Sequence, residues 1–247
     1  LNADILFGLP HQSQERITES VQKLLSLEPD RVALYGYAHV PWVSKRQKLI
    51  RKTTLPDEMA RYHLARRAAE RFTVAGMEAI GIDHFATRQD GLTRAKRNGR
   101  LRRNFQGYTD DDCQTLIGIG ASAISRFPGG YVQNAVATAA YNARIAAGEL
   151  PGARGYVLDE ADHLHARAIE HLMCNFTLDL TDLAKTFGPR AFALAPTLRS
   201  ISTRYAPFVR LDGMRLEVLP EGRALTRIVA SALDQHVPEG MRFSQAS

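Results

Sequence analysis

The first 35 residues alternate between strand-like and helical segments, and this pattern constrains the fold more than any other feature of the chain. Residues 3–8 form an apolar run that closes at a Gly-Leu-Pro turn, which is typical of a buried strand. After Ser13, a suitable N-cap, apolar residues recur at helical spacing. Residues 31–35 form a second apolar run. Strand, helix and strand at this spacing predict a βαβ unit of a parallel sheet.

The next segments extend this pattern. Residues 55–75 predict a long helix with Pro56 near its first turn, and residues 78–82 predict a third strand. The order strand, helix, strand, helix, strand indicates an α/β fold. Residues 84–112 then form a long polar and basic stretch without an apolar period. Such a stretch is typical of a loop that holds a ligand or closes over one.

The remaining residues predict a further strand, a helix and a separate C-terminal part. The strand is expected at 115–124 and the helix near 136–147, before a linker at 151–155. We therefore divide the chain into domains 1–150 and 151–247. The second domain is expected to hold three helices, a hairpin with an Asp-Gly turn and a last helix, at residues 160–174, 180–187, 191–205, 208–218 and 220–233. This order is similar to a small winged-helix module.

Composition narrows the class of protein. Hydrophobic residues make up 45% of the 247 residues and charged residues 23%, as in ordinary soluble proteins. No apolar run approaches the roughly 20 residues that span a bilayer, so we expect no membrane partner. Cys113 and Cys174 are the two cysteines, which suggests a reducing, cytoplasmic location and excludes a zinc site or a complete iron–sulfur ligand set. The chain starts inside an apolar run without Met, which we interpret as a missing N-terminal part.

The net charge of the chain does not by itself decide which partners the chain binds. The net charge is +6, and basic residues cluster at 94–103. This balance is compatible with a basic protein that has no special anionic partner. It would also steer a ligand with several carboxylates, or a nucleic acid, toward the cluster. The cluster lies outside the winged-helix-like part, whereas recognition helices carry their own basic face, so we predict no nucleic-acid partner.

Three positions near predicted strand ends are candidates for ligand contact. Asp4 lies within an apolar strand, where an unpaired carboxylate is costly. A helix N-terminus, an arginine or a pair of ligand hydroxyls such as a ribose could satisfy it, and these alternatives stay open. Ala38 could admit a flat ring beside the backbone or could reflect close packing. Asp83 and His84 are neighbours on a predicted extended chain, so their side chains should point to opposite faces and form no catalytic dyad.

The polar stretch and the glycine-rich segment after it hold further candidates. Phe105 and Gln106 could stack on and hydrogen-bond a ring ligand, or Phe105 could pin a loop to the surface. Arg102 and Arg103 could hold carboxylates with two hydrogen bonds each. The glycines of residues 118–121 suit a close backbone approach to a ligand. Without a GxGxxG motif, we exclude a dinucleotide-binding fold.

Taken in order, several segments resemble the oxygen-independent coproporphyrinogen III oxidases, a radical SAM family of haem synthesis. The resemblance runs nearly end to end. The segments are DILFGLP at 4–10, YAHVP at 37–41, DHFA at 83–86, RNFQGYT at 103–109, residues 116–125, CNF at 174–176 and RFS at 242–244. The HFA and NFQGY segments distinguish the oxidases from the related haem chaperones, which favours the oxidase branch.

The resemblance implies a fold, cofactors and a reaction. The fold would be the C-terminal part of a radical SAM (β/α) barrel with a small, mainly helical C-terminal domain. In the family, a reduced [4Fe–4S] cluster cleaves S-adenosylmethionine, and the radical formed takes hydrogen from a propionate. Loss of carbon dioxide and one electron then leaves a vinyl group. Two propionates of coproporphyrinogen III react in this way to give protoporphyrinogen IX, and an electron acceptor is required.

The resemblance also implies roles for individual residues. Asp4 and Ala38 would contact the first S-adenosylmethionine. Gln106 and Ile124 would bind S-adenosylmethionine nearer the substrate, with Phe105 in the substrate-side pocket. We add Arg103 as a possible partner of the substrate propionates, on its charge alone. No catalytic side chain is implied.

The cluster motif of the family, CxxxCxxC, is absent from the chain. We therefore interpret the chain as a C-terminal half that is inactive alone, from an enzyme that is monomeric at full length. The alternatives are a radical SAM-like haem chaperone and a nucleic-acid-binding winged-helix protein.

Overall fold

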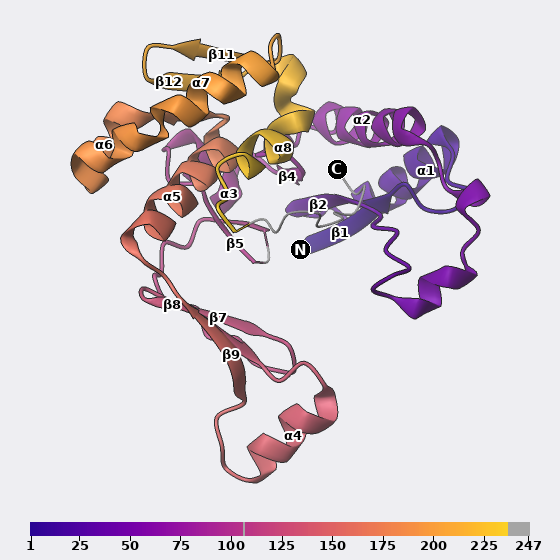
Figure 1. The fold of residues 1–247 in the computed structure, drawn as a ribbon. Helices are drawn as coiled ribbons and strands as arrows, with labels where there is room; N and C mark the ends of the chain where they lie inside the picture. The colour runs from indigo at the N-terminus through magenta and orange to yellow at the C-terminus, as the bar shows by residue number, and fades with distance from the viewer. Residues whose placement is uncertain (106, 237–247) are drawn as a thin grey trace.

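The computed structural model describes residues 1–105 and 107–236 (Figure 1). It begins with the predicted βαβ unit: β1 (Asn2–Phe7), α1 (Gln14–Leu25) and β2 (Arg31–Gly36). Strands β1 and β2 are parallel and pair along their whole length. Helix α1 begins after Ser13, whose side chain accepts a hydrogen bond from the backbone N–H of Arg16. The prediction is confirmed here because spacing and capping are local signals.

The third strand does not simply extend a parallel sheet. After the short 3₁₀ helices η1 (Lys45–Leu49) and η2 (Lys52–Thr54) and helix α2 (Glu58–Val74), strands β3 (Glu78–Ile80) and β4 (His84–Ala86) form a hairpin. The sheet order is β1-β2-β4-β3, and β4 runs antiparallel to both neighbours. Gly81 adopts a φ of +55°, a conformation that favours glycine, where the chain turns back. The predicted strand 78–82 therefore ends early, and its continuation returns beside β2.

Helices α1 and α2 cover one face of this sheet (Figure 1). The covering residues and the strand residues beneath them are fully or largely buried: Ile17, Val21, Leu64, Ala68 and Phe72 from the helices, and Val32, Leu34 and Phe85 from the strands. Because side chains alternate along a strand, Asp4, Tyr35 and His84 belong to the opposite face. We call this opposite face, which α1 and α2 leave uncovered, the open face.

The predicted loop at 84–112 contains regular structure, so that prediction is wrong. After β4 come α3 (Gly91–Arg97) and the hairpin of β5 (Arg102–Asn104) and β6 (Gly107–Thr109). These elements span three to seven residues, too few to show a clear apolar period. Part of the basic cluster lies on α3, where Lys96 donates to the carbonyl of Ala79 at 2.7 Å.

A three-stranded antiparallel sheet then extends away from the rest of the chain, with a helix at its far end (Figure 1). Its elements are β7 (Ile124–Phe127), β8 (Gly130–Asn134), α4 (Thr138–Ala146) and β9 (Gly152–Val157). We call these elements the arm. The helix prediction near 136–147 is confirmed.

Two strand boundaries of the arm differ from the predictions. The strand expected at 115–124 begins at Ile124 instead, because Gly120 and Ser122 adopt positive φ and break the extended chain before it. All of the linker predicted at 151–155 except Pro151 lies in β9. Gly155 allows β9 to lie close to β8, because a Cβ at this position would be only 3.0 Å from the Tyr131 carbonyl oxygen. The division at residue 150 stays a prediction.

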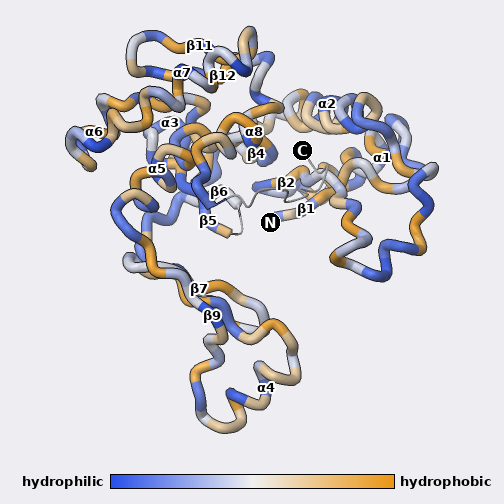
Figure 2. Tube along the Cα trace, viewed as in Figure 1, coloured by the Kyte–Doolittle hydropathy of each residue, from blue (hydrophilic) through white to orange (hydrophobic). Residues whose placement is uncertain are grey.

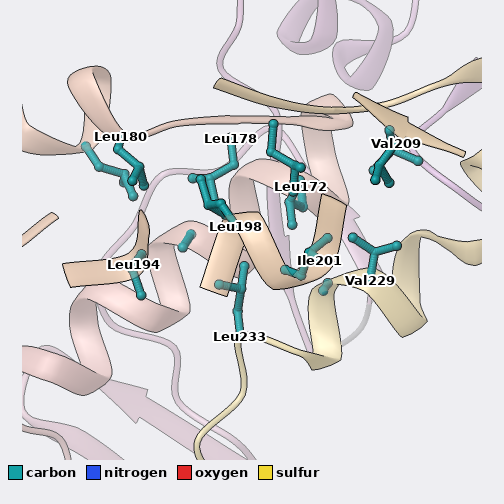
Figure 3. Packing of buried hydrophobic residues seen from close by; sticks show 14 of the residues in the cluster. Leu172, Leu178, Leu180, Leu194, Leu198, Ile201, Val209, Val229 and Leu233 are labelled. Atoms are coloured by element: carbon teal, nitrogen blue, oxygen red, sulfur yellow. The ribbon is translucent and has the colours of Figure 1, made fainter. Parts of the chain in front are cut away.

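The C-terminal part packs around one apolar cluster (Figure 3). Its elements are α5 (Glu160–Asn175), β10 (Thr177–Asp179), α6 (Leu180–Phe187), the 3₁₀ helix η3 (Gly188–Leu194), α7 (Ala195–Arg204), β11 (Val209–Asp212), β12 (Arg215–Val218), the 3₁₀ helix η4 (Pro220–Leu225) and α8 (Thr226–Ser231). The predicted helices and the hairpin are confirmed, except that residues 191–194 and 220–225 form 3₁₀ helix and α8 ends at Ser231. Gly213 takes a φ of +57° in the Asp-Gly turn.

Buried hydrogen bonds join this part to the first. The Tyr108 hydroxyl of β6 donates to the Met173 carbonyl of α5 at 2.7 Å and accepts the Ile82 N–H at 3.1 Å. Arg102 of β5 pairs with Glu170 of α5 at 3.2 Å. The β5–β6 hairpin is therefore held by the C-terminal helices. No helix in the described ranges is both long and apolar enough to cross a bilayer, and Figure 2 shows hydrophilic residues interspersed along the helices.

Candidate functional site

The open face of the sheet collects polar side chains from three strands. Asp4 of β1 pairs in register with Ala33 of β2, which pairs with His84 of β4, and Tyr35 lies one step farther along the same face of β2. The expectation that Asp4 is buried is wrong. Strand β1 is the edge of the sheet, and Asp4 is exposed. Asp4 has no hydrogen-bonding partner within the described ranges, so its carboxylate is available on this face.

Charged side chains surround the hydroxyl of Tyr35. Burial, the largest influence, raises the pKa of Tyr35, and Asp83 and then Asp4 raise it further. Arg103 and Arg227 act in the opposite direction. Two of the predicted site residues, Asp4 and Arg103, thus act on one phenol. Sequence reasoning missed Tyr35 as a site residue, although a tyrosine at the end of an otherwise apolar strand is a signal for one.

Asp83 and His84 interact directly, contrary to the prediction. Nδ1 of His84 lies 2.6 Å from Oδ1 of Asp83, and both side chains are about nine-tenths buried. The alternation argument fails because Asp83 lies in the turn before β4, outside the strand. The second carboxylate oxygen of Asp83 accepts from Arg227 of α8. Burial is the largest influence and raises the pKa of Asp83, but His84, Arg227 and Arg103 together bring it below its ordinary value.

The imidazole of His84 is held between two tyrosine rings. It meets Tyr35 at 5.8 Å and Tyr108 at 5.1 Å between ring centroids, both nearly edge-on. A Cβ on Gly107 would lie 2.7 Å from Nε2 of His84 and 3.4 Å from the hydroxyl oxygen of Tyr35. Gly107 also has a φ of +126°, so a larger residue is disfavoured on both grounds. The β5–β6 hairpin therefore closes directly against His84.

Arg103 lies at the edge of this group. Its guanidinium carbon is 5.6 Å from the centroid of the Tyr108 ring. Its Nε is buried without a hydrogen-bond partner among the described residues. Arg102, by contrast, is paired with Glu170, so it is less available to a carboxylate ligand than the sequence suggested.

Ala38 lies just beyond the carboxyl end of β2. Its carbonyl accepts from the side-chain amide of Gln47 at 3.0 Å. Its two neighbours carry buried polar atoms without partners in the described part of the chain, the hydroxyl of Tyr37 and Nδ1 of His39. A buried polar atom without a partner is costly, so this position suits a polar ligand.

Phe105 and Ile124 line one cavity of about 500 Å³ between the arm, α5 and residues 234–236. Its wall is mainly apolar and includes Tyr131 and Ile169. Phe105, 55% exposed, meets the ring of Tyr131 edge-on at 5.5 Å. These two rings also line a second cavity of about 780 Å³, which Arg103 borders. Gln106, the remaining predicted site residue, lies outside the described residues.

The sequence analysis also missed a polar group at the rim of the first cavity. Nε2 of His236 lies 2.5 Å from Oδ1 of Asp162, and the Tyr156 hydroxyl donates to Oδ2 of Asp162 at 3.3 Å. Asp162 also closes the capping box of α5 with Asp159. The group joins residues 74 positions apart, so no local sequence pattern predicts it.

Comparisons with known proteins place the chain in a family. No family model matches it. A protein of Cereibacter sphaeroides (strain ATCC 17025) named oxygen-independent coproporphyrinogen III oxidase is 51% identical over 248 residues, which cover all of this chain and 55% of that protein. A protein of the same name from Thermostichus vulcanus is 37% identical, and the match covers all of this chain and 77% of that protein.

This chain belongs to the oxygen-independent coproporphyrinogen III oxidase family. The resemblance found in the sequence is confirmed. The chain spans about half the length of most of the curated relatives that it matches. A solved structure from Escherichia coli, described as coproporphyrinogen III oxidase (HemN), a radical SAM enzyme, matches with a TM-score of 0.88 and 30% identity over 96% of this chain and 55% of that chain. The predicted fold class, part of a radical SAM α/β fold, is also confirmed.

The cysteines of this family member do not offer a cluster site. Cys113 is exposed and Cys174 is buried. Burial, the largest influence, raises the pKa of the Cys174 thiol to about 12, so it stays protonated at neutral pH and is a poor metal ligand. No group of three metal-binding side chains occurs in the described ranges. An iron–sulfur cluster therefore does not fit the residues that the chain presents.

We expect anaerobic reconstitution of this chain with iron and sulfide to leave no stoichiometric [4Fe–4S] cluster, because two separated cysteines, one of them protonated, cannot supply the thiolates. Iron and sulfide analysis after gel filtration measures this. The Cys113→Ala variant is the control for iron held non-specifically by the exposed thiol. Four iron and four sulfide per chain would contradict the expectation.

Proposed function

We propose that this chain forms the substrate side of an enzyme that converts two propionates of coproporphyrinogen III to vinyl groups, giving protoporphyrinogen IX. One observation carries the proposal most directly. The resemblance assigns Phe105 to the substrate-side pocket and Ile124 to S-adenosylmethionine nearer the substrate; the two come from separate hairpins and line one cavity. Asp4, which the resemblance assigns to the cofactor, lies on the open face of the neighbouring sheet. The chain thus carries candidate residues for both sides.

S-adenosylmethionine fits the residues on the open face. The exposed carboxylate of Asp4 is suited to accept hydrogen bonds from the two ribose hydroxyls. Ala38 leaves room beside two buried polar atoms that lack partners in the described part, those of Tyr37 and His39. When bound in the complete enzyme, this cofactor would supply the hydrogen abstraction that precedes loss of each carboxyl group as carbon dioxide. One electron passes to an acceptor each time.

The cavity residues would orient the tetrapyrrole and limit access of water. Phe105 and Tyr131 offer two rings against which individual pyrrole rings of the tetrapyrrole can pack. Arg103, whose Nε lacks a partner among the described residues, would bind a propionate carboxylate by a charge-assisted hydrogen bond. The cluster does not fit the cysteines of this chain, so we derive no step through it.

A chimaera tests the function. This chain would replace the matching region of the Cereibacter sphaeroides relative to which it is 51% identical. We expect the chimaera, supplied anaerobically with coproporphyrinogen III, S-adenosylmethionine, a reductant and an electron acceptor, to form the divinyl product. The unchanged relative is the positive control. A chimaera that retains its cluster but binds haem stoichiometrically and forms no vinyl product would favour the haem-chaperone alternative instead.

A further inference from the structure

A chain of two side-chain contacts connects the C-terminal helices to the open face: Arg227 contacts Asp83, and Asp83 contacts His84. Asp83 is 11% exposed and uses both carboxylate oxygens, one toward Arg227 and one toward Nδ1 of His84. Its lowered pKa means that it is ionised at neutral pH. An ionised carboxylate is an acceptor, so Nδ1 of His84 must carry the hydrogen of this bond. Asp83 thereby selects one tautomer of His84.

The selected tautomer has a consequence for the other ring nitrogen. In a neutral imidazole with hydrogen on Nδ1, Nε2 is an acceptor. Nε2 faces Gly107, close to the Tyr35 hydroxyl, and the two flanking tyrosine rings limit rotation of the imidazole. The hairpin thus closes against an imidazole ring whose Nδ1 is a fixed donor to Asp83 and whose rotation is limited by two tyrosine rings.

We propose that Asp83 and Arg227 are positioning residues for His84 and, through it, for the hairpin that carries Phe105. Arg227 belongs to α8 and lies 144 positions from Asp83. The C-terminal helices therefore act as part of the site's support, in addition to packing around their own core. The assignment of Phe105 to the substrate side rests on the proposed function; the Arg–Asp–His arrangement rests on geometry alone.

The first readout is the tautomer of His84, measured by nitrogen NMR on the full chain labelled with ¹⁵N-histidine, with the His84→Gln variant to assign the signal. We expect one tautomer, with hydrogen on Nδ1, in the unchanged chain. Asp83→Asn should shift the signal to a mixture or to the other tautomer. Arg227→Met should do so in part, and Arg227→Lys should restore the original signal because it retains the charge.

The second readout is the position of the hairpin. A fluorine label on the Phe105 ring should give one ¹⁹F signal, and Asp83→Asn and Arg227→Met should shift or broaden it. Arg210→Met is the matched control, since Arg210 also pairs with a carboxylate, that of Glu217, but on the solvent-facing side of the β11–β12 hairpin. It should leave both readouts unchanged.

Two outcomes would overturn the proposal. One is a His84 tautomer that is the same in the unchanged chain, in Asp83→Asn and in Arg227→Met. The other is a ¹⁹F signal that responds no more to these variants than to Arg210→Met. If Asp83→Asn does not fold, Arg227→Met decides, because its side chain is 38% exposed and tolerates change better. Neither readout requires cofactor or turnover, so failure of the proposed function would leave them interpretable.

Discussion

Phe105→Ala in the chimaera should lower vinyl formation by about 10²-fold, the order expected when a substrate is misplaced by an ångström or so. Phe105 lines both cavities and packs edge-on against Tyr131. Because it is 55% exposed, its loss should remove a ligand-facing surface with little effect on folding. Cleavage of the first S-adenosylmethionine should continue, since we assign that molecule to the sheet that carries Asp4. Product analysis and 5′-deoxyadenosine release measure the two steps separately.

Phe127→Ala is the matched control for this variant. Phe127 is a partly exposed phenylalanine of the arm, at the end of β7, and it lines neither of the two cavities described above. It should retain vinyl formation within about twofold, as expected for a surface change worth less than roughly 0.5 kcal/mol. An equal loss of vinyl formation in both variants would show that any change in this region is harmful. It would contradict the assignment of Phe105 to the substrate side.

Leu172→Ala should lower the free energy of unfolding by about 2–5 kcal/mol, the usual cost of a cavity at a buried leucine. Leu172 is fully buried in the C-terminal cluster, among Leu178, Leu198 and Ile201 (Figure 3). Helix α5, which carries it, also holds the β5–β6 hairpin through Glu170 and Met173. Denaturant unfolding followed by circular dichroism gives the difference.

The control for this second variant is Leu150→Ala. Leu150 is 89% exposed, before β9 in the arm, and its truncation should change the unfolding free energy by less than about 0.5 kcal/mol. A Leu172→Ala chain as stable as the unchanged one would mean that the C-terminal cluster does not stabilise the fold as described.

Local signals in the sequence predicted those parts of the fold that local chemistry determines. The βαβ unit, helices α2 and α5 and the Asp-Gly hairpin follow from spacing, capping and turn residues within one element. Strands β4, β5 and β6 are three residues each, too short for an apolar period to identify them. The insertion of β4 between β2 and β3 depends on pairing across the sheet, which no single segment encodes.

Some residues of the candidate site could be predicted from the sequence, and some of its contacts could not. Asp4, Ala38, Phe105 and Ile124 were selected by the family resemblance, and the structure brings Phe105 to Ile124 at one cavity. Residue chemistry alone left Asp4 with several possible partners. The contact of Asp83 with Arg227 was missed because it joins positions 144 apart. The Asp83–His84 bond was rejected because both residues were expected on an extended chain, whereas Asp83 lies in the turn before β4.

The most direct test of this account is the amount of S-adenosylmethionine cleaved per vinyl group formed, measured for Asp4→Ala and Phe105→Ala in the chimaera. If Asp4 belongs to the cofactor side and Phe105 to the substrate side, Asp4→Ala should lower both quantities together and keep the ratio unchanged. Phe105→Ala should raise the ratio, because cleavage continues without product. An unchanged ratio in Phe105→Ala, or a raised ratio in Asp4→Ala alone, would contradict the assignment of the two sides.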